Sequence, residues 1–286
     1  MHSHPQSNQS RPFLKWVGGK VRLLPQLLPL LPEGNRLIEP FVGAGSAFLG
    51  SSYPKAVLGD ANPDLVAVWT AIRERPREFS DQASVLFTEA NRSDEAYKRI
   101  RAKYNASEDR FERAVLFIYL NKFGFNGIYR VNQRGGFNVP YAKPSVVPNF
   151  PFAEVEAASR KLQAAMVVCS GFRGTMSLAS RGDVVYCDPP YVDLSDRPSF
   201  VAYTKEGFGP TEQVALVDAS IAAARRGATV VISNHDTPYS RELYRVFDIS
   251  VVSARRSISA VGSARGIVGE LVATLTPARL ASASWD

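Results

Sequence analysis

One segment near the N-terminus constrains the fold of this chain more than any other. It runs from a short apolar stretch at 36–40 through glycines at 43–45 and a helix start at Ser46 to a second apolar stretch at 56–60. A strand, a turn, a helix and a strand in this order form a βαβ unit, in which the two strands are parallel. The segment therefore predicts an α/β fold built on a parallel sheet.

The same alternation returns after residue 150. We expect a Rossmann-like, doubly wound sheet whose last two strands form a C-terminal antiparallel pair. An apolar fraction of 45% is ordinary for a globular core of this kind. The expected elements are, in order, a helix at 152–165, strands at 166–169 and 183–187, a helix at 211–226, and strands at 228–233, 248–253 and 268–275.

A helical insertion separates the two parts of this pattern. From 62 to 123 the sequence is rich in charge and has little that is typical of a strand, and the apolar residues at 111–122 repeat about every 3.6 residues. The next stretch, 123–141, is dense in aromatic residues, glycine and asparagine, and predicts a β-hairpin with its turn at 132–136. We therefore expect a main domain from residues 1–62 and 151–286, in which 1–12 form a flexible tail, and an inserted domain at 63–150.

Composition narrows what the chain binds and where it works. It has 34 Lys and Arg against 27 Asp and Glu, a formal net charge of +7, which fits a nucleic-acid partner with its negative phosphates. Cys169 and Cys187 lie far apart in apolar runs, which indicates reduced, buried thiols in a cytoplasmic protein. The sequence shows neither an apolar signal core nor a stretch of ~20 apolar residues, and it has no CxxC pair or His/Cys cluster. We expect no metal, no membrane association and no obligate protein partner.

The glycine turn belongs to a loop with features of a nucleoside site. Gly43 and Gly45 let the backbone approach a ligand, and the helix N-terminus that follows favours an anionic group. Asp60, at the end of the next strand, can accept hydrogen bonds from ribose hydroxyls. A GxG turn alone is more often only a tight turn, and Asp60 favours the nucleoside interpretation. Phe48 stands where a dinucleotide motif needs a small residue, so an adenosyl amino acid fits better than NAD.

A second loop, Asp188-Pro189-Pro190-Tyr191, follows an apolar strand. Its two prolines fix the backbone, which suits a group of rigid hydrogen-bond acceptors. If Asp188 and the carbonyl of Pro189 each accept one hydrogen of a base amino group, the nitrogen lone pair turns toward a methyl donor, while Tyr191 stacks on the base. A plain turn after a buried strand is the alternative, and the neighbouring nucleoside loop favours the catalytic interpretation. The pattern predicts transfer of a methyl group from a sulfonium donor without a metal.

Together these segments resemble the DNA adenine methyltransferase (Dam) family, in the family's order and over nearly all of residues 12–276. The resemblance implies a methyltransferase sheet, a catalytic domain at 1–62 and 151–286, and a DNA target-recognition domain at 63–150. It also implies S-adenosylmethionine as methyl donor and N6 of a flipped adenine in double-stranded DNA as acceptor, within the target GATC. The matching segments are 13–20 (FLKWVGGK), 39–46 (EPFVGAGS), 120–127 (LNKFGFNG), 137–140 (FNVP), 186–191 (YCDPPY), 232–236 (ISNHD) and 255–259 (RRSIS).

The resemblance also implies residue roles. Arg130 matches an arginine that reads a guanine, Phe125 an aromatic residue that enters the duplex beside the flipped adenine, and Lys15 a residue that reaches the first base pair. Asn126, Ile128 and Pro140 match neighbouring DNA contacts, and Lys143 lies where a phosphate contact is expected. The catalytic residues implied are Asp188, Pro189, Pro190 and Tyr191, and the donor-binding residues are Trp16, Lys20, Phe41, Gly43, Gly45, Asp60 and Asp188.

Four positions depart from the family pattern. Phe123 and Phe125 stand where tyrosines are usual, which keeps the aromatic stacking and removes the hydroxyl contacts. Tyr129 replaces a smaller residue. Lys143 stands where arginine is expected, and a lysine makes a less directional phosphate contact.

Several interpretations stay open at this point. His235 either lies near the base or donor or belongs to a polar loop, and we favour the loop. Arg255, Arg256 and Arg265 either contact phosphates or are solvated, and the loop at 192–209 is a candidate for ordering on DNA. Competing functions are an amino-methyltransferase for cytosine N4 or RNA, and an inactive DNA-binding relative. The intact Asp188 and the hairpin with its arginine favour an active enzyme on double-stranded DNA.

Overall fold

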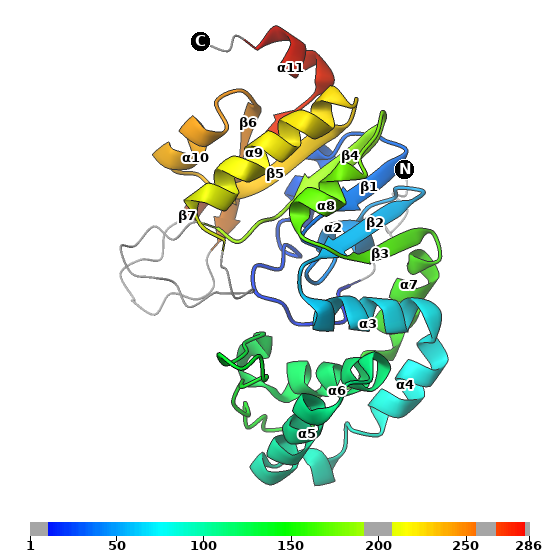
Figure 1. Ribbon diagram of the computed structural model, residues 1–286. Coiled ribbons are helices and arrows are strands. Elements are labelled where there is room, and N and C mark those ends of the chain that lie inside the picture. The colour runs from blue at the N-terminus through cyan, green and yellow to red at the C-terminus, as the bar shows by residue number, and fades with distance from the viewer. Residues whose placement is uncertain (1–10, 192–207, 256–266, 284–286) are drawn as a thin grey trace, which may run out of the picture.

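A seven-stranded sheet forms the centre of the computed structural model, which describes residues 11–191, 208–255 and 267–283 (Figure 1). The strand order is β3-β2-β1-β4-β5-β7-β6. The first five strands are parallel, and β7 is antiparallel to both β5 and β6. The predicted α/β class with a mostly parallel sheet is confirmed. The strands are β1 (Arg36–Glu39), β2 (Ala56–Asp60), β3 (Ala165–Cys169), β4 (Asp183–Cys187), β5 (Thr229–His235), β6 (Asp248–Arg255) and β7 (Ile267–Leu275).

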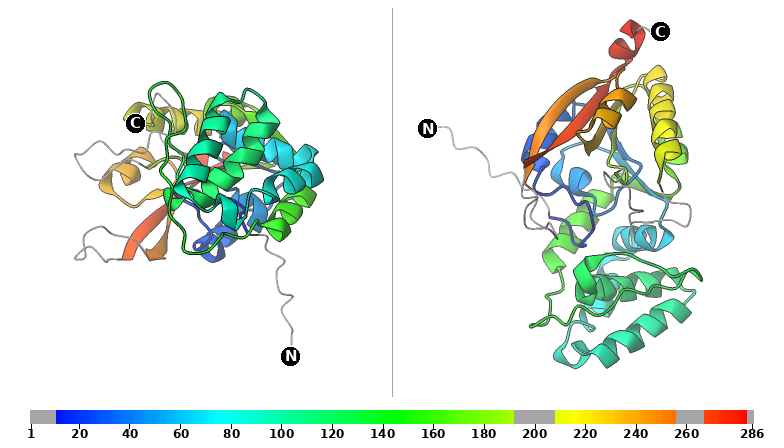
Figure 2. Two further views of the ribbon diagram at one scale, coloured as in Figure 1. Left: turned by 90° about the horizontal axis from the view of Figure 1, so that it is seen from below. Right: turned by 90° about the vertical axis from the view of Figure 1, so that its left-hand side faces the viewer.

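Helices cover both faces of this sheet, as Figure 2 shows for α2 and α9. The reason is visible in β4, where Val184 and Tyr186 join one apolar core and Val185 and Cys187 join the other. Side chains of α1, α2, α3 and α7 fill the first core, and those of α8 and α9 fill the second. A strand buried on both faces is therefore a continuous apolar run. Residues 1–10 of the predicted tail lie outside the described residues.

The helices begin where the sequence supplies caps. The side chain of Asn62 accepts the backbone N–H groups of Asp64 and Leu65 at the start of α3, and Ser93 and Asp109 cap α5 and α6 in the same way. The helix predicted at 152–165 ends earlier, because β3 begins at Ala165. The helices are α1 (Leu24–Leu27), α2 (Ser46–Gly50), α3 (Pro63–Glu74), α4 (Pro76–Ser84), α5 (Asp94–Ala106), α6 (Arg110–Phe123), α7 (Phe152–Leu162), α8 (Phe172–Ser177), α9 (Pro210–Arg225), α10 (Pro238–Leu243) and α11 (Pro277–Ser282), with short 3-10 helices at Leu28–Leu30, Glu89–Asn91 and Phe125–Gly127.

The insertion packs as a helical layer beside the sheet, with α4, α5 and α6 below it in Figure 1. Helix α3 contacts β2 and β3 on one side and α6 on the other, so it joins the two parts. Aromatic rings fill the insertion, and Tyr119 stacks on Phe123 with ring centroids 4.2 Å apart. The division at residues 63 and 150 stays a prediction.

The predicted hairpin is looser than expected. Among the described residues its two sides pair through two isolated bridges, Gly124 with Tyr141 and Val131 with Phe137, and not through regular strands. A side chain of α5 also holds this segment: Asn105 bonds both the N–H and the C=O of Phe137. The predicted turn at 132–136 is present, with the N–H of Asn132 donating to the C=O of Gly136.

The two cysteines differ in burial. Cys187 is buried in the second core, as predicted. The prediction for Cys169 is wrong, because it is exposed at the end of β3, which is an edge strand of the sheet. Both thiols are free.

Candidate active site

The carboxyl ends of the five parallel strands meet at one edge of the sheet, which is where doubly wound folds bind ligands. Asp60 ends β2, Asp188 follows β4, and His235 ends β5. Residues from distant parts of the sequence therefore face one another. The DPPY residues, the glycine loop and Lys20 all belong to this edge.

Asp188 is already engaged by two donors. Lys20 Nζ lies 2.7 Å from Asp188 Oδ1, and Ser233 Oγ donates to the same oxygen at 3.1 Å. Ser233 in turn contacts the hydroxyl of Tyr186 at 3.1 Å. Lys20 is only 6% exposed, so this ion pair is shielded from water and stronger than a surface pair. The structure thus unites two predicted site residues, Lys20 and Asp188, and adds Ser233.

Tyr191 is held by a carboxylate that the sequence did not single out. Its hydroxyl donates to Glu270 Oε1 at 2.9 Å, and the same oxygen lies 3.6 Å from Lys20 Nζ. Burial is the main cause that raises the pKa of Glu270. The ring of Tyr191 lies edge-on to His235 with centroids 4.4 Å apart, and Lys20 Nζ is 4.6 Å from its centre. His235, which we assigned to a polar loop, therefore packs directly on the predicted catalytic tyrosine.

A buried amide fixes the second proline of the tetrapeptide. Gln213, which is fully buried in α9, donates from Nε2 to the carbonyl of Pro190 at 3.1 Å. Its Oε1 accepts from Asn234 Nδ2 at 3.3 Å and from Tyr244 Oη at 3.2 Å. This network joins the loop after β4 to β5 and α9, so it holds the tetrapeptide from behind.

The glycine loop has a backbone that requires its glycines. Gly43 and Gly45 have φ of +47° and +65°, a conformation that disfavours other residues. Asp60 accepts the N–H of Gly43 at 3.3 Å and that of Asn62 at 2.9 Å, which ties the loop to the end of β2. Burial raises the pKa of Asp60 to about 6. Helix α2 spans only five residues, so the predicted attraction of an anion to its N-terminus is weaker than for a long helix.

Two aromatic residues flank this loop. A Cβ on Gly43 would lie 2.9 Å from Cδ1 of Trp16, so glycine is needed for the indole to lie there. Phe41 packs on the second core, where its ring stacks on Phe172 with centroids 5.7 Å apart and lies edge-on to Phe208 with centroids 5.5 Å apart. Phe41 is half-buried and Trp16 is also partly exposed, so both rings keep a surface for a ligand.

Glu39, at the end of β1, is a buried acid with unused bonding capacity. It is 2% exposed, and its Oε1 has no hydrogen-bond partner among the described residues. Burial, and to a lesser extent the nearby charge of Asp188, raise the pKa of Glu39 to about 8. A buried acceptor without a partner is costly in a folded protein, which points to a group that occupies it during function.

The predicted DNA-contacting residues lie in or beside the hairpin. Arg130 is exposed, and its guanidinium donates to the side chain and carbonyl of Asn138 at 2.7 and 3.0 Å. Phe125 is 51% exposed. Asn126 and Lys143 have φ of +54° and +52°. The other predicted contacts are the exposed Pro140, whose carbonyl accepts the N–H of Phe125 at 2.9 Å, and the half-buried Ile128.

Lys15 is joined to the hairpin by an asparagine. Asn121, 1% exposed in α6, accepts the N–H of Lys15 at 2.9 Å and donates to the carbonyls of Lys15 and Gly127 at 2.7 and 3.1 Å. Lys15 itself is exposed. The N-terminal segment and the start of the hairpin at Gly127 are therefore held together by Asn121.

Some predicted features fall outside the described residues. These are Arg256, Arg265 and most of the loop at 192–209; Arg255 is described only as the last residue of β6. Within 11–191, 208–255 and 267–283, the acids, histidines and cysteines form no group that could hold a metal ion. No helix in that part of the chain is long and apolar enough to cross a membrane.

Sequence reasoning missed the residues that hold the catalytic groups. Ser233, Asn234 and Glu270 are polar residues within strands, and Gln213 lies on a helix. A signal was present in Ser233 and Asn234, because two polar residues ending an apolar strand are unusual. Glu270 and Gln213 offer no such signal, since their partners are distant in sequence.

Comparison with known proteins gives consistent matches. The family model described as D12 class N6 adenine-specific DNA methyltransferase matches residues 16–258. The DNA adenine methylase of Vibrio cholerae serotype O1 is 42% identical over 270 residues, which cover 94% of this chain and 97% of that protein. The DNA adenine methylases of Escherichia coli strain K12 and Salmonella typhi are 42% and 41% identical over 269 residues, covering 94% of this chain and 96% of each relative.

Proposed function

Because the chain belongs to the D12 class N6 adenine-specific DNA methyltransferase family, we propose that it moves a methyl group from S-adenosylmethionine to N6 of an adenine flipped out of double-stranded DNA, within GATC. That it is an adenine-specific DNA methyltransferase follows from the family and its relatives. The donor, the base flipping and the target sequence are the proposal. The single observation that carries it is the cluster of Asp188, Lys20 and Tyr191 beside the glycine loop.

The tetrapeptide supplies acceptors for the adenine amino group. Asp188 and the carbonyl of Pro189 would each accept one amino hydrogen, so that the lone pair of N6 points at the methyl group. Lys20 and Ser233 both contact Oδ1 of Asp188, which leaves Oδ2 as the oxygen proposed to meet the base. Tyr191 would stack on the adenine, with its ring fixed by the bond to Glu270.

The donor site would be formed by the loop around Gly43 and Gly45, by Asp60 for the ribose hydroxyls, and by Trp16, Lys20 and Phe41. The unpartnered Oε1 of Glu39 fits the donor's amino group, because a buried acceptor gains a charge-assisted hydrogen bond there. When bound, the sulfonium supplies an activated methyl group, and its positive charge is neutralised by the transfer. No metal is required for that chemistry.

The insertion at 63–150 is proposed as the target-recognition domain. The amino group of an adenine in a duplex is out of reach, so the base must leave the stack. Phe125, half of whose surface is exposed, would fill the space that the base leaves. Arg130 would pair with O6 and N7 of a guanine, which provides ~1–3 kcal/mol of discrimination. Lys15, Asn126, Ile128, Pro140 and Lys143 would make the neighbouring contacts.

The test is methyl transfer from tritiated S-adenosylmethionine to duplexes with and without GATC, together with a single-stranded RNA. We expect label in the GATC duplex, and N6-methyladenine after digestion to nucleosides. Equal label in both duplexes would refute the target sequence. Label on cytosine or RNA would favour the alternative acceptors, and no label would favour an inactive DNA-binding relative.

A further inference from the structure

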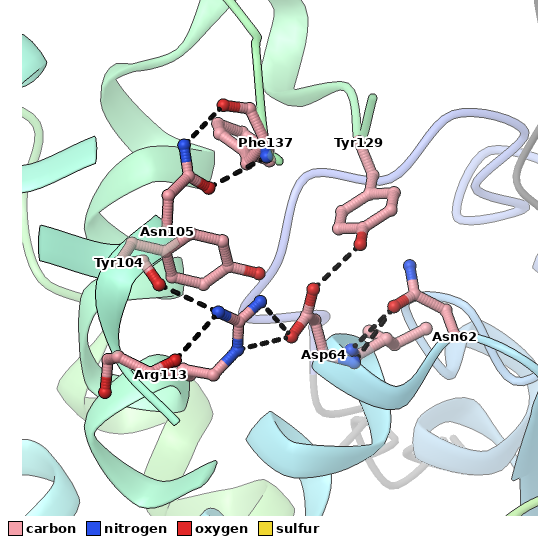
Figure 3. Close-up of polar contacts among 9 residues, drawn as sticks. Asn62, Asp64, Tyr104, Asn105, Arg113, Tyr129 and Phe137 are labelled. Carbon is pink, nitrogen blue, oxygen red and sulfur yellow. Dashed lines mark hydrogen bonds and ion pairs between the residues drawn. The ribbon is translucent and has the colours of Figure 1, made fainter. Parts of the chain in front are cut away.

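Tyr129 makes contacts that a smaller residue at this position could not make. It precedes Arg130 in the hairpin, and its hydroxyl donates to Asp64 Oδ2 at 2.8 Å (Figure 3). Its ring stacks on Trp16, with centroids 6.2 Å apart and planes 29° apart. One side chain of the proposed recognition hairpin therefore touches both the start of α3 and a proposed donor-binding residue.

Asp64 connects this hydroxyl to the loop around Asp60. Its N–H donates to Oδ1 of Asn62 at 3.0 Å, and the N–H of Asn62 donates to Asp60 Oδ1 at 2.9 Å. Arg113 of α6 donates to Asp64 Oδ1 at 2.7 and 2.9 Å and to the carbonyl of Tyr104 at 2.8 Å, as Figure 3 shows. Asp64 is therefore held by both the sheet side and the insertion, and Tyr129 bonds to a side chain that the two share.

The ring of Tyr129 provides a second, independent connection. It packs on Trp16, and Trp16 lies against Gly43, whose N–H donates to Asp60. Tyr129 is thus connected to the loop around Asp60 in two ways, by its hydroxyl through Asp64 and by its ring through Trp16.

On its other side, Tyr129 supports the arm that carries Arg130. Its ring lies 5.9 Å from that of Phe137, and Asn105 holds the backbone of Phe137 through two hydrogen bonds. Asn138, the next residue, accepts from the guanidinium of Arg130. Tyr129 therefore lies beside Arg130 in the sequence and, through Phe137, also beside Asn138, which holds the guanidinium of Arg130.

We propose that Tyr129 is a positioning residue that holds the guanine-reading arm of the hairpin in a fixed place relative to the donor-binding loop. The inference rests on the proposed donor and DNA sites. It predicts that removing one hydroxyl, whose bond is to Asp64, affects donor binding and base discrimination together. A ring that only fills an apolar core has no such effect once its hydroxyl is removed.

The test compares Tyr129→Phe with the matched control Tyr119→Phe. The control also removes a tyrosine hydroxyl that donates one hydrogen bond in the helical insertion, in this case from Tyr119 to the backbone carbonyl of Asn91 at 2.6 Å. Two quantities are measured: the KM for S-adenosylmethionine, and the ratio of kcat/KM for a GATC duplex to that for a duplex with 7-deazaguanine at the guanine. The second duplex lacks the N7 acceptor that Arg130 would use.

We expect Tyr129→Phe to raise the donor KM and lower the discrimination ratio, each by about three- to tenfold, a fraction of what one hydrogen bond to a charged group contributes. Tyr119→Phe should leave both near the wild-type values even if it lowers the Tm. Unchanged values for Tyr129→Phe, or a loss of Tm alone, would overturn the inference.

A double variant tests the route through Asp64. In Asp64→Ala the acceptor of the hydroxyl is removed, so adding Tyr129→Phe should cause little further loss. Fully additive losses would contradict the route. A wild-type protein that does not discriminate the two duplexes would overturn the proposed contact of Arg130 with guanine N7 and this inference with it, while methylation of the GATC duplex would leave the proposed reaction intact; discrimination that survives Tyr129→Phe overturns the inference alone.

Discussion

Lys20 Nζ lies 2.7 Å from Oδ1 of Asp188, so the carboxylate proposed to accept a hydrogen bond from the adenine amino group is already paired with an ammonium group of the protein. The ammonium is also 3.6 Å from Glu270 Oε1 and 4.6 Å from the centre of the Tyr191 ring. It therefore stands between two carboxylates that would otherwise repel each other. This arrangement assigns Lys20 an electrostatic role at the tetrapeptide in addition to its proposed contact with the donor.

Lys20→Gln should lower kcat/KM by about 10- to 100-fold, because the two carboxylates lose the charge between them. It should also lower the Tm, since a shielded ion pair is broken. Lys55→Gln, which removes an exposed lysine, is the control. Steady-state methylation and thermal unfolding measure both effects, and wild-type kinetics in Lys20→Gln would contradict the electrostatic role.

Gln213→Leu should lower kcat more than it changes the donor KM. The carbonyl of Pro190 and the polar groups of Asn234 and Tyr244 lose their partner, which costs about 1–3 kcal/mol of stability and loosens the tetrapeptide. Gln163→Leu removes a glutamine whose amide bonds the carbonyl of Arg73 at the surface, and it should leave kcat unchanged. A Gln213→Leu enzyme with a normal kcat would show that the network does not position the loop.

Donor binding should weaken as the pH falls through about 6. Burial raises the pKa of Asp60 from 3.8 to about 6, so the folded protein takes up a proton there at a higher pH than the unfolded chain does. Ionised Asp60 therefore reduces stability above pH 6, and this cost is relieved as the pH falls. Protonation also removes an acceptor for the ribose hydroxyls, so the KM for S-adenosylmethionine should rise.

Asp60→Asn separates this titration from others. It should raise the donor KM at pH 7.5, on the order of tenfold, and flatten the dependence of KM on pH near 6. The control Asp248→Asn, at the start of the edge strand β6, should keep the wild-type profile. A pH profile that is the same in wild type and Asp60→Asn would assign the titration to another group.

Arg130→Ala should relax selection of the guanine by about 1–3 kcal/mol, measured as kcat/KM on duplexes changed at that base. Arg134→Ala, at the exposed tip of the same hairpin, removes an equal charge and should weaken binding to all duplexes alike. If Arg130→Ala keeps the selectivity of the wild type, another residue reads the guanine.

The sequence predicted the sheet and its loops because these features are local. Apolar runs ending in Gly43-Ala44-Gly45 or in Asp188-Pro189-Pro190 leave few alternatives to a buried strand followed by a rigid loop, and parallel strands bring such loops to one edge. The exposure of Cys169 could not be seen, because it depends on which strand lies at the edge.

The contacts that hold the site were not predictable for a similar reason. Glu270 and Gln213 reach their partners across 79 and 23 positions of sequence, and each sits in an element whose pattern is satisfied without it. The contact of the hairpin with α5 was also not predictable, because Asn105 bonds the N–H and C=O of Phe137 from an element 32 positions away in the sequence. Tyr129 was noticed only as an unusual residue, and its partners became visible with the fold.

The central claim is that Asp188 accepts a hydrogen bond from the amino group of a flipped adenine. The most direct measurement is the N6-methyladenine content of a GATC duplex after incubation with S-adenosylmethionine. Wild-type protein should produce it, and Asp188→Ala should reduce it by at least about 10³-fold while still binding the duplex with similar affinity. Comparable N6-methyladenine from Asp188→Ala, or none from the wild type, would contradict the account.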